Sequence, residues 1–219
     1  EEGFSEISFD LNDQLVVDSI VYEGGLLEFM HVDHIVRIPL PDSLGIASID
    51  SLTVHYSGVP AETGLGSFGM GTHDDGPAIW NVSPPYGARD FWPCKQDLSD
   101  KIDSIDIIVE TPSRYRAASN GKLIEEYGDG DTKYYHWKHR YPIPAYLVGI
   151  AVSEFEVYSD YVPFEDDSIE ILNYVYPSSL ESAKEGTPAT IEIMQFYNEI
   201  LGLYPYADEK YGHAQFGWG

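Results

Sequence analysis

The sequence is short of cysteine and of basic residues, and both shortages restrict what the chain can do. Cys94 is the single cysteine among 219 residues, so no disulfide can form within the chain and cysteines cannot build a metal site. Twelve lysines and arginines stand against 37 aspartates and glutamates, and the formal net charge of −25 repels phosphate backbones and anionic lipid headgroups. We therefore expect no nucleic-acid partner and no membrane partner. Solubility is the simpler explanation of the acidity, and an acidic site for cationic ligands is the alternative.

Long apolar runs and a catalytic zinc motif are also missing. No run approaches the roughly 18 to 20 apolar residues that a membrane-spanning helix needs, so we expect no membrane insertion. The first ten residues, EEGFSEISFD, lack the basic and then apolar order of a signal peptide, although a signal removed before residue 1 would leave no trace. The motif H-E-x-x-H does not occur, so the residues themselves offer no catalytic group and no metal site.

Strand-like patterns dominate residues 5–158. Apolar and polar residues alternate in LTVHY (52–56) and in DSIDIIVE (103–110), as expected of sheets that are wet on one face. LVGIAVSEFEV (147–157) is more evenly apolar and predicts a strand covered on both faces. Asn120-Gly121 and the GDGD of 128–131 predict tight turns between strands. Many short strands without a helical pattern predict an antiparallel β-sandwich or a saddle of sheets over residues 1–158.

The pattern changes near residue 160. FEDDSIEILNYVYP (164–177) still predicts a strand, and SSLESAKEG (178–186) is interpreted as a flexible link. TPATIEIMQFYNEILG (187–202) is the one convincing helix, with Thr187 as its cap, Pro188 in its first turn and Gly202 at its end. YGHAQFGWG (211–219) then predicts a further strand.

One helix and two strands cannot close a core of their own size, so residues 159–219 are expected to be the beginning of a second, incomplete domain. Ile193, Tyr197 and Ile200 share one face of the predicted helix, and Phe196 lies beside them. We expect this apolar surface to be exposed, or masked by self-association, when the rest of the domain is absent.

Three short motifs agree with functional patterns in spacing alone. GLGSFG (64–69) fits G-x-G-x-x-G but runs into MGTHDDGP, where a helix is not expected, so we interpret it as a glycine-rich hairpin tip or loop. The pairs His31/His34 and His136/His139 lie in strand-like sequence, where an odd spacing sends side chains to opposite faces. We therefore expect packed or solvated histidines rather than shared metal ligands.

Three longer stretches resemble one known family. PYGARDFWPCKQDLSDKIDSIDIIVETP (85–112) and TKYYHWKHRYPIPAYLVGIAVSEFEVYS (132–159) resemble a loop and strands in the N-terminal domain of zinc aminopeptidases of the alanyl aminopeptidase and leukotriene hydrolase family. FYNEILGLYPYADEKYGHAQFGWG (196–219) resembles the helix, turn and strand that lead to this family's G-x-M-E motif. The pairing of P-I-P-A-Y-L with Y-P-Y-A-D-E-K-Y is the most specific part, whereas residues 1–77 agree in type only.

The resemblance implies a saddle-shaped β domain at the entrance of a cleft, followed by the start of a thermolysin-like catalytic domain. The family holds one zinc ion with H-E-x-x-H and a later glutamate, and its G-x-M-E glutamate anchors the amino group of the substrate. All of these motifs would follow residue 219. The resemblance therefore implies an N-terminal fragment of a zinc-dependent aminopeptidase, inert alone, whose partners are peptide substrates and its own catalytic domain.

The resemblance also points to a substrate rim around residue 84. The family's N-terminal domain contributes a Glu or Gln contact five residues before the arginine that is here Arg89, and that position is Pro84. A proline side chain cannot accept a hydrogen bond from an ammonium group. Ser83, Pro84, Tyr86 and Arg89 are the candidates for lining the substrate pocket.

A structural role for the same loop is the alternative. In that interpretation Phe91, Trp92 and Cys94 form a buried plug under the sheet, and Arg89 pairs with a carboxylate. At the level of the whole chain, the alternative to an aminopeptidase fragment is a free-standing β-sandwich module for binding or adhesion. A secreted or periplasmic location is compatible with such acidity. Side-chain preference and any epoxide hydrolase activity have no signature in these residues.

Overall fold

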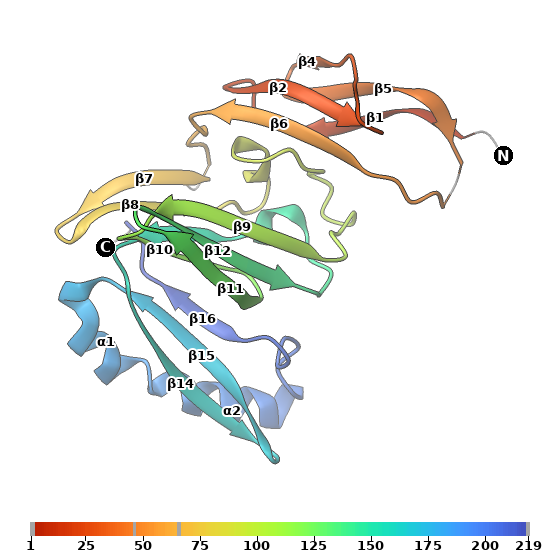
Figure 1. Cartoon of the computed structure of the whole chain (residues 1–219). Helices are drawn as coiled ribbons and strands as arrows, with labels where there is room; N and C mark the ends of the chain where they lie inside the picture. Colours follow the sequence, from red (N-terminus) through yellow and green to blue (C-terminus); the bar gives the residue numbers. More distant parts are fainter. Residues whose placement is uncertain (1–2, 46, 65–66, 218–219) are drawn as a thin grey trace. The chain divides into compact units, whose positions relative to one another are not determined.

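The computed structural model describes residues 3–45, 47–64 and 67–217 (Figure 1). The chain forms two compact units. The first comprises Glu1–Phe68, Val82–Lys101 and Pro144–Leu147, and the second comprises Gly69–Asn81, Ile102–Ile143 and Val148–Gly219. The predicted division into residues 1–158 and 159–219 stays a prediction.

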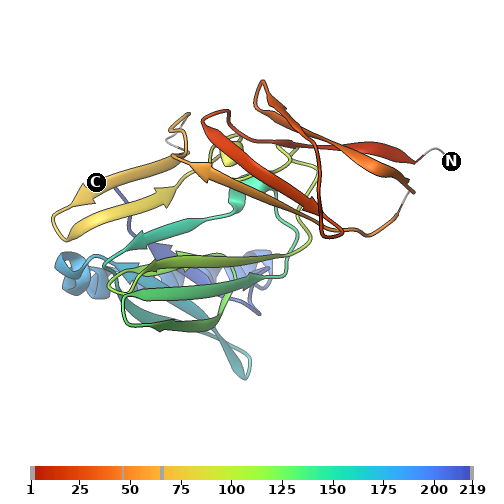
Figure 2. The same cartoon turned by 45° about the horizontal axis from the view of Figure 1, so that its top comes forward.

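The first unit contains two three-stranded sheets, drawn from red to orange in Figure 2. One has the order β1-β5-β4, with β1 Phe4–Asp10, β4 Met30–Val32 and β5 Ile35–Leu44, and the other has the order β3-β2-β6, with β2 Leu15–Tyr22, β3 Gly25–Leu26 and β6 Leu52–Gly58. Their shared core consists of Leu11, Leu15, Val17, Ile20, Val36 and Ile38. Because this cluster draws on strands of both sheets, the two apolar faces pack on each other as in a β-sandwich.

The second unit contains three sheets. Their orders are β10-β13-β8-β7, β11-β12-β9 and β14-β15-β16. The strands are β7 Phe68–His73, β8 Gly76–Asn81, β9 Ile105–Pro112, β10 Arg116–Ser119, β11 Lys122–Asp129, β12 Thr132–His139, β13 Ile150–Ser153, β14 Glu156–Phe164, β15 Asp167–Val175 and β16 Tyr211–Ala214. Every paired strand runs antiparallel to its neighbour except β16, which is parallel to β15 and is reached through two helices. The mainly β fold with a strand, helix and strand at its end is confirmed.

The strand predictions hold where side chains alternate. In β9, Ile107 is buried while Asp106, Ile108 and Glu110 are exposed, as the pattern of DSIDIIVE predicts. The single strand predicted over residues 147–157 is wrong in extent. A 3-10 turn at Ala145–Leu147 is followed by β13. The strand structure is then interrupted at Glu154 and Phe155 before β14 begins. Residues 151–153, which are buried as predicted, lie within β13, whereas the buried Val148 and Phe155 lie outside it.

Two helices connect β15 to β16, where the sequence predicted one. A 3-10 turn at Pro177–Ser179 leads into α1 (Leu180–Gly186), so the interpretation of residues 178–186 as a flexible link is wrong. Pro177 has the fixed backbone angle of a first helical turn, and the Glu, Ala and Lys that follow are good helix formers. The helix α2 (Ala189–Leu201) ends at Gly202 with a φ of 91°, as predicted.

Thr187 does not cap α2, contrary to the prediction. Its hydroxyl donates instead to Asp160 Oδ2 at 2.8 Å, and Pro188 occupies the cap position without a side-chain hydrogen bond. Asp160 comes from β14, 27 residues earlier, so this tertiary bond ties the start of α2 to the neighbouring sheet.

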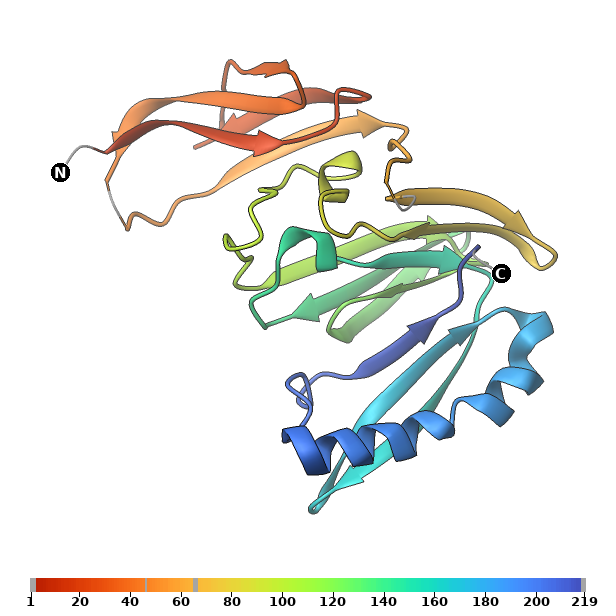
Figure 3. The ribbon, with the colours of Figure 1, turned by 180° about the vertical axis from the view of Figure 1, so that it is seen from behind.

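The helix α2 buries one side against the β14–β15 sheet (Figure 3). Met194 is 6% exposed and packs with Val162, Ile169 and Ile171. A second group of apolar residues on α2 is 51% to 57% exposed, and we call it the outer face of α2: Ile193, Phe196, Tyr197 and Ile200. The apolar surface that the sequence predicted is therefore present and exposed.

Turn chemistry was predicted with mixed success. Gly128–Asp131 connects β11 to β12 in a hairpin, as expected. Asn120-Gly121 makes a turn but not a hairpin, because β10 pairs with β13 whereas β11 pairs with β12. Gly121 has a φ of 75°, and a Cβ there would lie 2.0 Å from the carbonyl oxygen of Lys138, so only glycine fits this close approach. Residues 64–69 lead into β7, not into a helix, and Leu65 and Gly66 lie outside the described residues.

Candidate functional site

The candidate site is the irregular segment 83–97, which belongs entirely to the first unit. A short 3-10 turn, Ala88–Asp90, is its only helical part. Its later half is fastened to the end of β1, since the Asp10 amide donates to the Cys94 carbonyl at 2.7 Å and the Cys94 amide donates back at 3.0 Å. The backbone amide of Gln96 donates to Asp10 Oδ2 at 3.1 Å. These hydrogen bonds hold the irregular segment beside β1, as a neighbouring strand would be held.

Asp90 is the centre of the polar contacts that hold the segment. Its side chain is 1% exposed and accepts hydrogen bonds from Asn12 Nδ2 at 2.8 Å, from Ser67 Oγ at 2.6 Å and from the hydroxyl of Thr63. Three donors from distant parts of the chain therefore satisfy one buried carboxylate, which is the condition for burying it at tolerable cost. No local pattern in the sequence marks Asp90, because none of these partners is near it in sequence.

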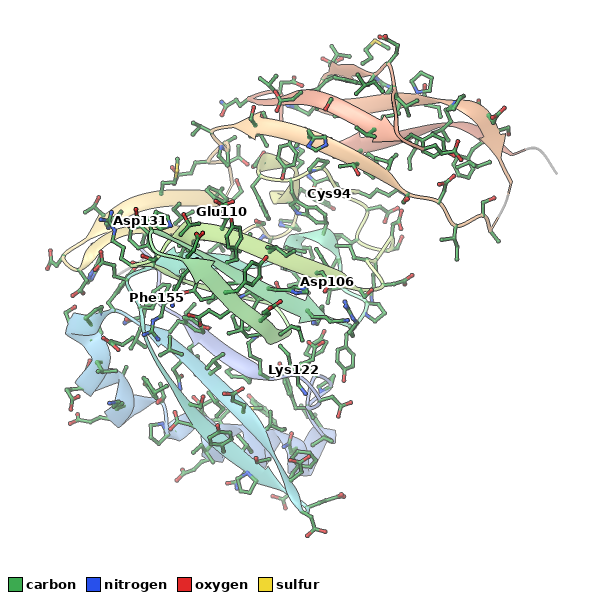
Figure 4. The ribbon with its side chains drawn as sticks, in the orientation of Figure 1. Cys94, Asp106, Glu110, Lys122, Asp131 and Phe155 are labelled. Carbon is green, nitrogen blue, oxygen red and sulfur yellow. The ribbon has the colours of Figure 1, made fainter. Side chains whose placement is uncertain are left out.

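The segment also supplies a buried apolar block. Phe91 and Cys94 are 8% and 3% exposed, and the Phe91 ring lies 5.8 Å from that of Phe68. Tyr56 donates its hydroxyl to the Phe91 carbonyl at 3.0 Å. Burial raises the pKa of the Cys94 thiol to about 12, with a further contribution from Asp10, so this cysteine is a packed apolar residue rather than a nucleophile (Figure 4). Trp92 is only partly buried.

The four rim candidates differ in what they offer. Ser83 is 2% exposed and its hydroxyl donates to the Ser67 carbonyl at 3.0 Å. Pro84 is exposed, and its peptide bond with Pro85 is cis. Tyr86 is 57% exposed, and its carbonyl accepts a hydrogen bond from the side chain of Gln96. The loop therefore presents Pro84 and Tyr86 to solvent and keeps Ser83 inside.

Arg89 is partly buried within the same turn. Its carbonyl accepts a hydrogen bond from the Asn12 amide at 2.8 Å. Its guanidinium lowers the pKa of the Cys94 thiol slightly against the larger effect of burial, so the two side chains are near each other. Among the ion pairs of the described residues none includes Arg89, and the predicted pairing with a carboxylate is not found there.

The first histidine pair is arranged differently from the prediction. Asp33 and His34 have φ values of 55° and 61°, so His34 sits in a turn and strand alternation does not apply. His31 Nε2 lies 3.4 Å from Asp13 Oδ1, and His34 Nδ1 lies 3.5 Å from Asp13 Oδ2. However, His34 Nδ1 accepts from the Asp13 amide at 3.1 Å, and His31 Nε2 lies 3.0 Å from the Leu11 carbonyl. The imidazoles converge on one carboxylate but are already engaged by the backbone.

The second histidine pair points to opposite sides of β12, as predicted. His136 Nε2 meets Asp106 Oδ1 at 2.7 Å, whereas His139 Nδ1 bonds to Glu209, which also accepts from the Arg140 amide at 2.7 Å. Within residues 3–45, 47–64 and 67–217, no group of three or more His, Cys, Asp or Glu side chains is arranged to hold a metal ion. In the same residues, neither helix is long and apolar enough to cross a membrane.

Comparisons with known proteins place this geometry in a known fold. No protein-family model and no curated protein matches the chain. Solved structures do match. A mutant of a two-domain M1 zinc metallopeptidase bound to L-arginine superposes with a TM-score of 0.79 and 22% identity, over 98% of this chain and 49% of that one. An M1 zinc metallopeptidase from Deinococcus radiodurans gives a TM-score of 0.78 and 23% identity, with the same coverage. The chain has the fold of the N-terminal half of M1 zinc metallopeptidases.

The match agrees with the resemblance carried by the three sequence stretches and extends it to residues 1–77, which agree in type only. Another of the matching structures is a mutant of the Deinococcus radiodurans M1 zinc metallopeptidase bound to a Tyr-Ser-Ala substrate. The present chain spans about half the length of the solved structures that it matches. At identities below one quarter, the likeness establishes the fold of an M1 metallopeptidase half and does not assign an activity.

Proposed function

We propose that this chain is the N-terminal region of a zinc-dependent aminopeptidase, which removes residues from the amino termini of peptides. The observation that carries the proposal is the match over 98% of this chain to only 49% of M1 zinc metallopeptidases. The three motif-like stretches point independently in the same direction. In this proposal the chain alone is not catalytic and forms part of the entrance to the substrate cleft.

The described residues do not fit a zinc ion. The histidines that come together at Asp13 are engaged by the backbone, and His136 and His139 face apart. The proposal therefore assigns zinc binding to residues that lie outside this chain, and no catalytic step is assigned to the residues within it.

What this chain would contribute is the rim of the cleft. The exposed ring of Tyr86 supplies a flat apolar surface for a substrate side chain, and the bond from Gln96 fixes the backbone that carries it. Pro84 has no side-chain acceptor for the substrate's ammonium group, so we assign amino-terminal recognition to carboxylates beyond this chain. Ser83 and Arg89 hold the turn rather than contact the substrate.

The proposal is tested by comparing two proteins. One is the 219-residue chain, and the other is the same chain extended by the residues encoded after Gly219. We expect the extension to contain G-x-M-E and H-E-x-x-H, to bind one zinc ion and to hydrolyse aminoacyl anilides, while the shorter chain does neither. Stoichiometric zinc and turnover in the shorter chain would contradict the proposal. An extension without these motifs would favour the free-standing β-sandwich module.

The role of the rim is tested in the extended protein with Tyr86→Ala. Loss of a contact made equally in the ground state and the transition state should raise KM about threefold or more and leave kcat nearly unchanged. Tyr161→Ala is a matched control, because Tyr161 is 55% exposed and Tyr86 is 57% exposed, and Tyr161 lies in β14, far from this segment in sequence. Equal increases of KM in the two variants would contradict a role of Tyr86 in the rim.

A further inference from the structure

A cavity of about 340 Å³ lies within the second unit and is built from five strands and the segment before β16. Residues of β10, β11, β12, β14 and β15 form its walls together with Glu209 and Lys210. Figure 4 places Lys122, one of the wall residues, at the beginning of β11. Tyr135 and Tyr174 are 1% and 4% exposed and form buried, rigid parts of the lining. A volume of this size accepts a small molecule.

The walls carry equal numbers of positive and negative side chains. Three are basic and three are acidic, namely Arg116, Lys122, Lys210, Glu126, Glu170 and Glu209. In the described part of the chain, none of the three cations forms an ion pair with any of the three carboxylates. Opposite charges therefore face the same cavity without neutralising each other by direct contact.

Each of the three carboxylates has another partner, and Glu209 is bonded by His139 and by the Arg140 amide. Glu126 forms an ion pair with Lys133, and Glu170 accepts a hydrogen bond from Ser159 Oγ at 2.6 Å. A hydroxyl bond to one oxygen leaves Glu170 a full negative charge and free lone pairs. Glu170 is thus the acidic wall residue best able to accept bonds from a ligand.

The cations are equally available. Lys210 Nζ donates to the Ser119 carbonyl at 2.9 Å and lies 4.7 Å from the centre of the Trp137 ring, which fixes the amine and leaves further N–H donors. The side chains of Arg116 and Lys122 form no hydrogen bond or ion pair with any residue that the structure describes. The apolar side chains of Val157 and Leu172 lie in the same lining.

We propose that this cavity binds a free α-amino acid with an apolar side chain. The basic wall residues would hold its carboxylate, the acidic ones its ammonium group, and Val157 and Leu172 its side chain. A simple anion would gain from three cations but face three carboxylates, and a simple cation would meet the reverse. A zwitterion satisfies both sets, which is the condition for complementarity in a partly buried site. This inference does not depend on the proposed peptidase activity.

The test uses the 219-residue chain and three probes of the same shape. L-leucine carries both charges, 4-methylpentanoate lacks the ammonium group and 3-methylbutylamine lacks the carboxylate. In a titration followed by amide NMR, L-leucine should shift the signals of lining residues saturably. Each analogue should bind about tenfold more weakly or less, since it leaves one set of charges unpaired. Equal binding of 4-methylpentanoate would make this an anion site, and absence of saturable shifts with all three probes would also overturn the proposal.

Two substitutions separate recognition from folding. Arg116→Gln and Glu170→Gln should each weaken L-leucine binding about tenfold while the amide spectrum away from the cavity is preserved. Glu170→Gln should in addition reduce the preference for L-leucine over 4-methylpentanoate, because it removes a negative charge that repels the anion. Damage to packing would not change that ratio. Arg114→Gln is the matched control, since Arg114 is exposed and outside the lining. The proposal fails if the control weakens L-leucine as much as Arg116→Gln does.

Discussion

At the scale of single residues, the candidate site depends most on Asp90, whose side chain is buried beneath its surface. Asp90 joins Asn12, Thr63 and Ser67 to the turn that carries Tyr86. Sequence separations of 78, 27 and 23 residues between these partners mean that one carboxylate brings together three segments of the first unit. The position of the proposed rim therefore depends on a buried carboxylate outside it.

Asp90→Ala is predicted to destabilise the first unit strongly. The change leaves buried donors without an acceptor, and each such group costs about 1 to 3 kcal/mol, so a loss of at least about 3 kcal/mol is expected. Urea unfolding followed by tryptophan fluorescence measures it. Asp97→Ala is the control in the same segment, because Asp97 is exposed and, among the described residues, its hydrogen bonds are with the nearby Ser99 and Asp100. Equal urea midpoints for the two variants would show that Asp90 does not hold the segment.

Lys210 should give the chain a distinctive dependence on pH. Burial lowers its pKa from 10.5 to about 8, against the opposing effects of Glu209 and Glu170. Between pH 8 and 10.5 the unfolded chain keeps this proton while the folded chain has released it. The contribution of Lys210 to the free energy of unfolding therefore rises with pH in that window and is constant below it.

The difference in unfolding free energy between the wild type and Lys210→Met isolates this contribution. The wild type should become more stable relative to Lys210→Met as pH increases from about 8 to about 9.5. Ionisation of the tyrosines affects both proteins alike and cancels in the difference. Urea titrations at several pH values measure it. A difference that stays constant over this range would mean that Lys210 keeps an ordinary pKa in the folded chain.

At the scale of elements, α2 has two groups of apolar side chains, and only one of them packs against a described element, the β14–β15 sheet. Met194 faces the β14–β15 sheet, while the outer face around Phe196 and Ile200 remains exposed. The double variant Phe196→Gln and Ile200→Gln should reduce self-association of the chain, measured by sedimentation, and leave its fold intact. Met194→Gln should instead lower stability, because it places a polar group in the core.

Hydrogen exchange examines the same element without substitutions. An incomplete domain should protect the amides of residues 160–219 unevenly, with weaker protection in the helices than in β15. Uniform and strong protection of the whole stretch in a monomer would contradict the idea that a further domain normally covers the outer face.

The sequence predicted those elements whose pattern is local. The alternation in β9 and the positive-φ glycine at the end of α2 are encoded by the residues themselves. Thr187 failed as a cap because Asp160, from another element, takes its hydroxyl. The strand prediction at His34 was wrong because this residue has a positive φ in a turn that hydrogen-bonds to Asp13, 21 residues away. At the site, the burial of Phe91 and Cys94 follows from residue type, whereas the exposure of Tyr86 and the role of Asp90 depend on neighbours that only the fold brings near.

At the scale of the whole molecule, the net charge of −25 should oppose folding, since compaction brings like charges together. Raising the NaCl concentration from about 0.01 M to about 0.15 M shortens the screening length from roughly 30 Å to 8 Å. We therefore expect the Tm at pH 7 to increase over this range, as measured by circular dichroism. Closer to the sequence pI of about 4.3, the increase should shrink because the carboxylates begin to take up protons.

A comparison of two salts at equal ionic strength separates the two explanations of the acidity, solubility and a site for cationic ligands. If the carboxylates are distributed over the whole surface and serve solubility, each pair repels weakly. Screening by salt then changes the Tm smoothly, and no ligand is needed. Carboxylates gathered to receive a cationic group would respond in addition to an organic cation at constant ionic strength. We expect NaCl and tetramethylammonium chloride to raise the Tm equally at 0.15 M ionic strength. A larger increase with the organic cation would contradict the solubility explanation and indicate a collected acidic surface, which an enzyme acting on peptide ammonium groups could use.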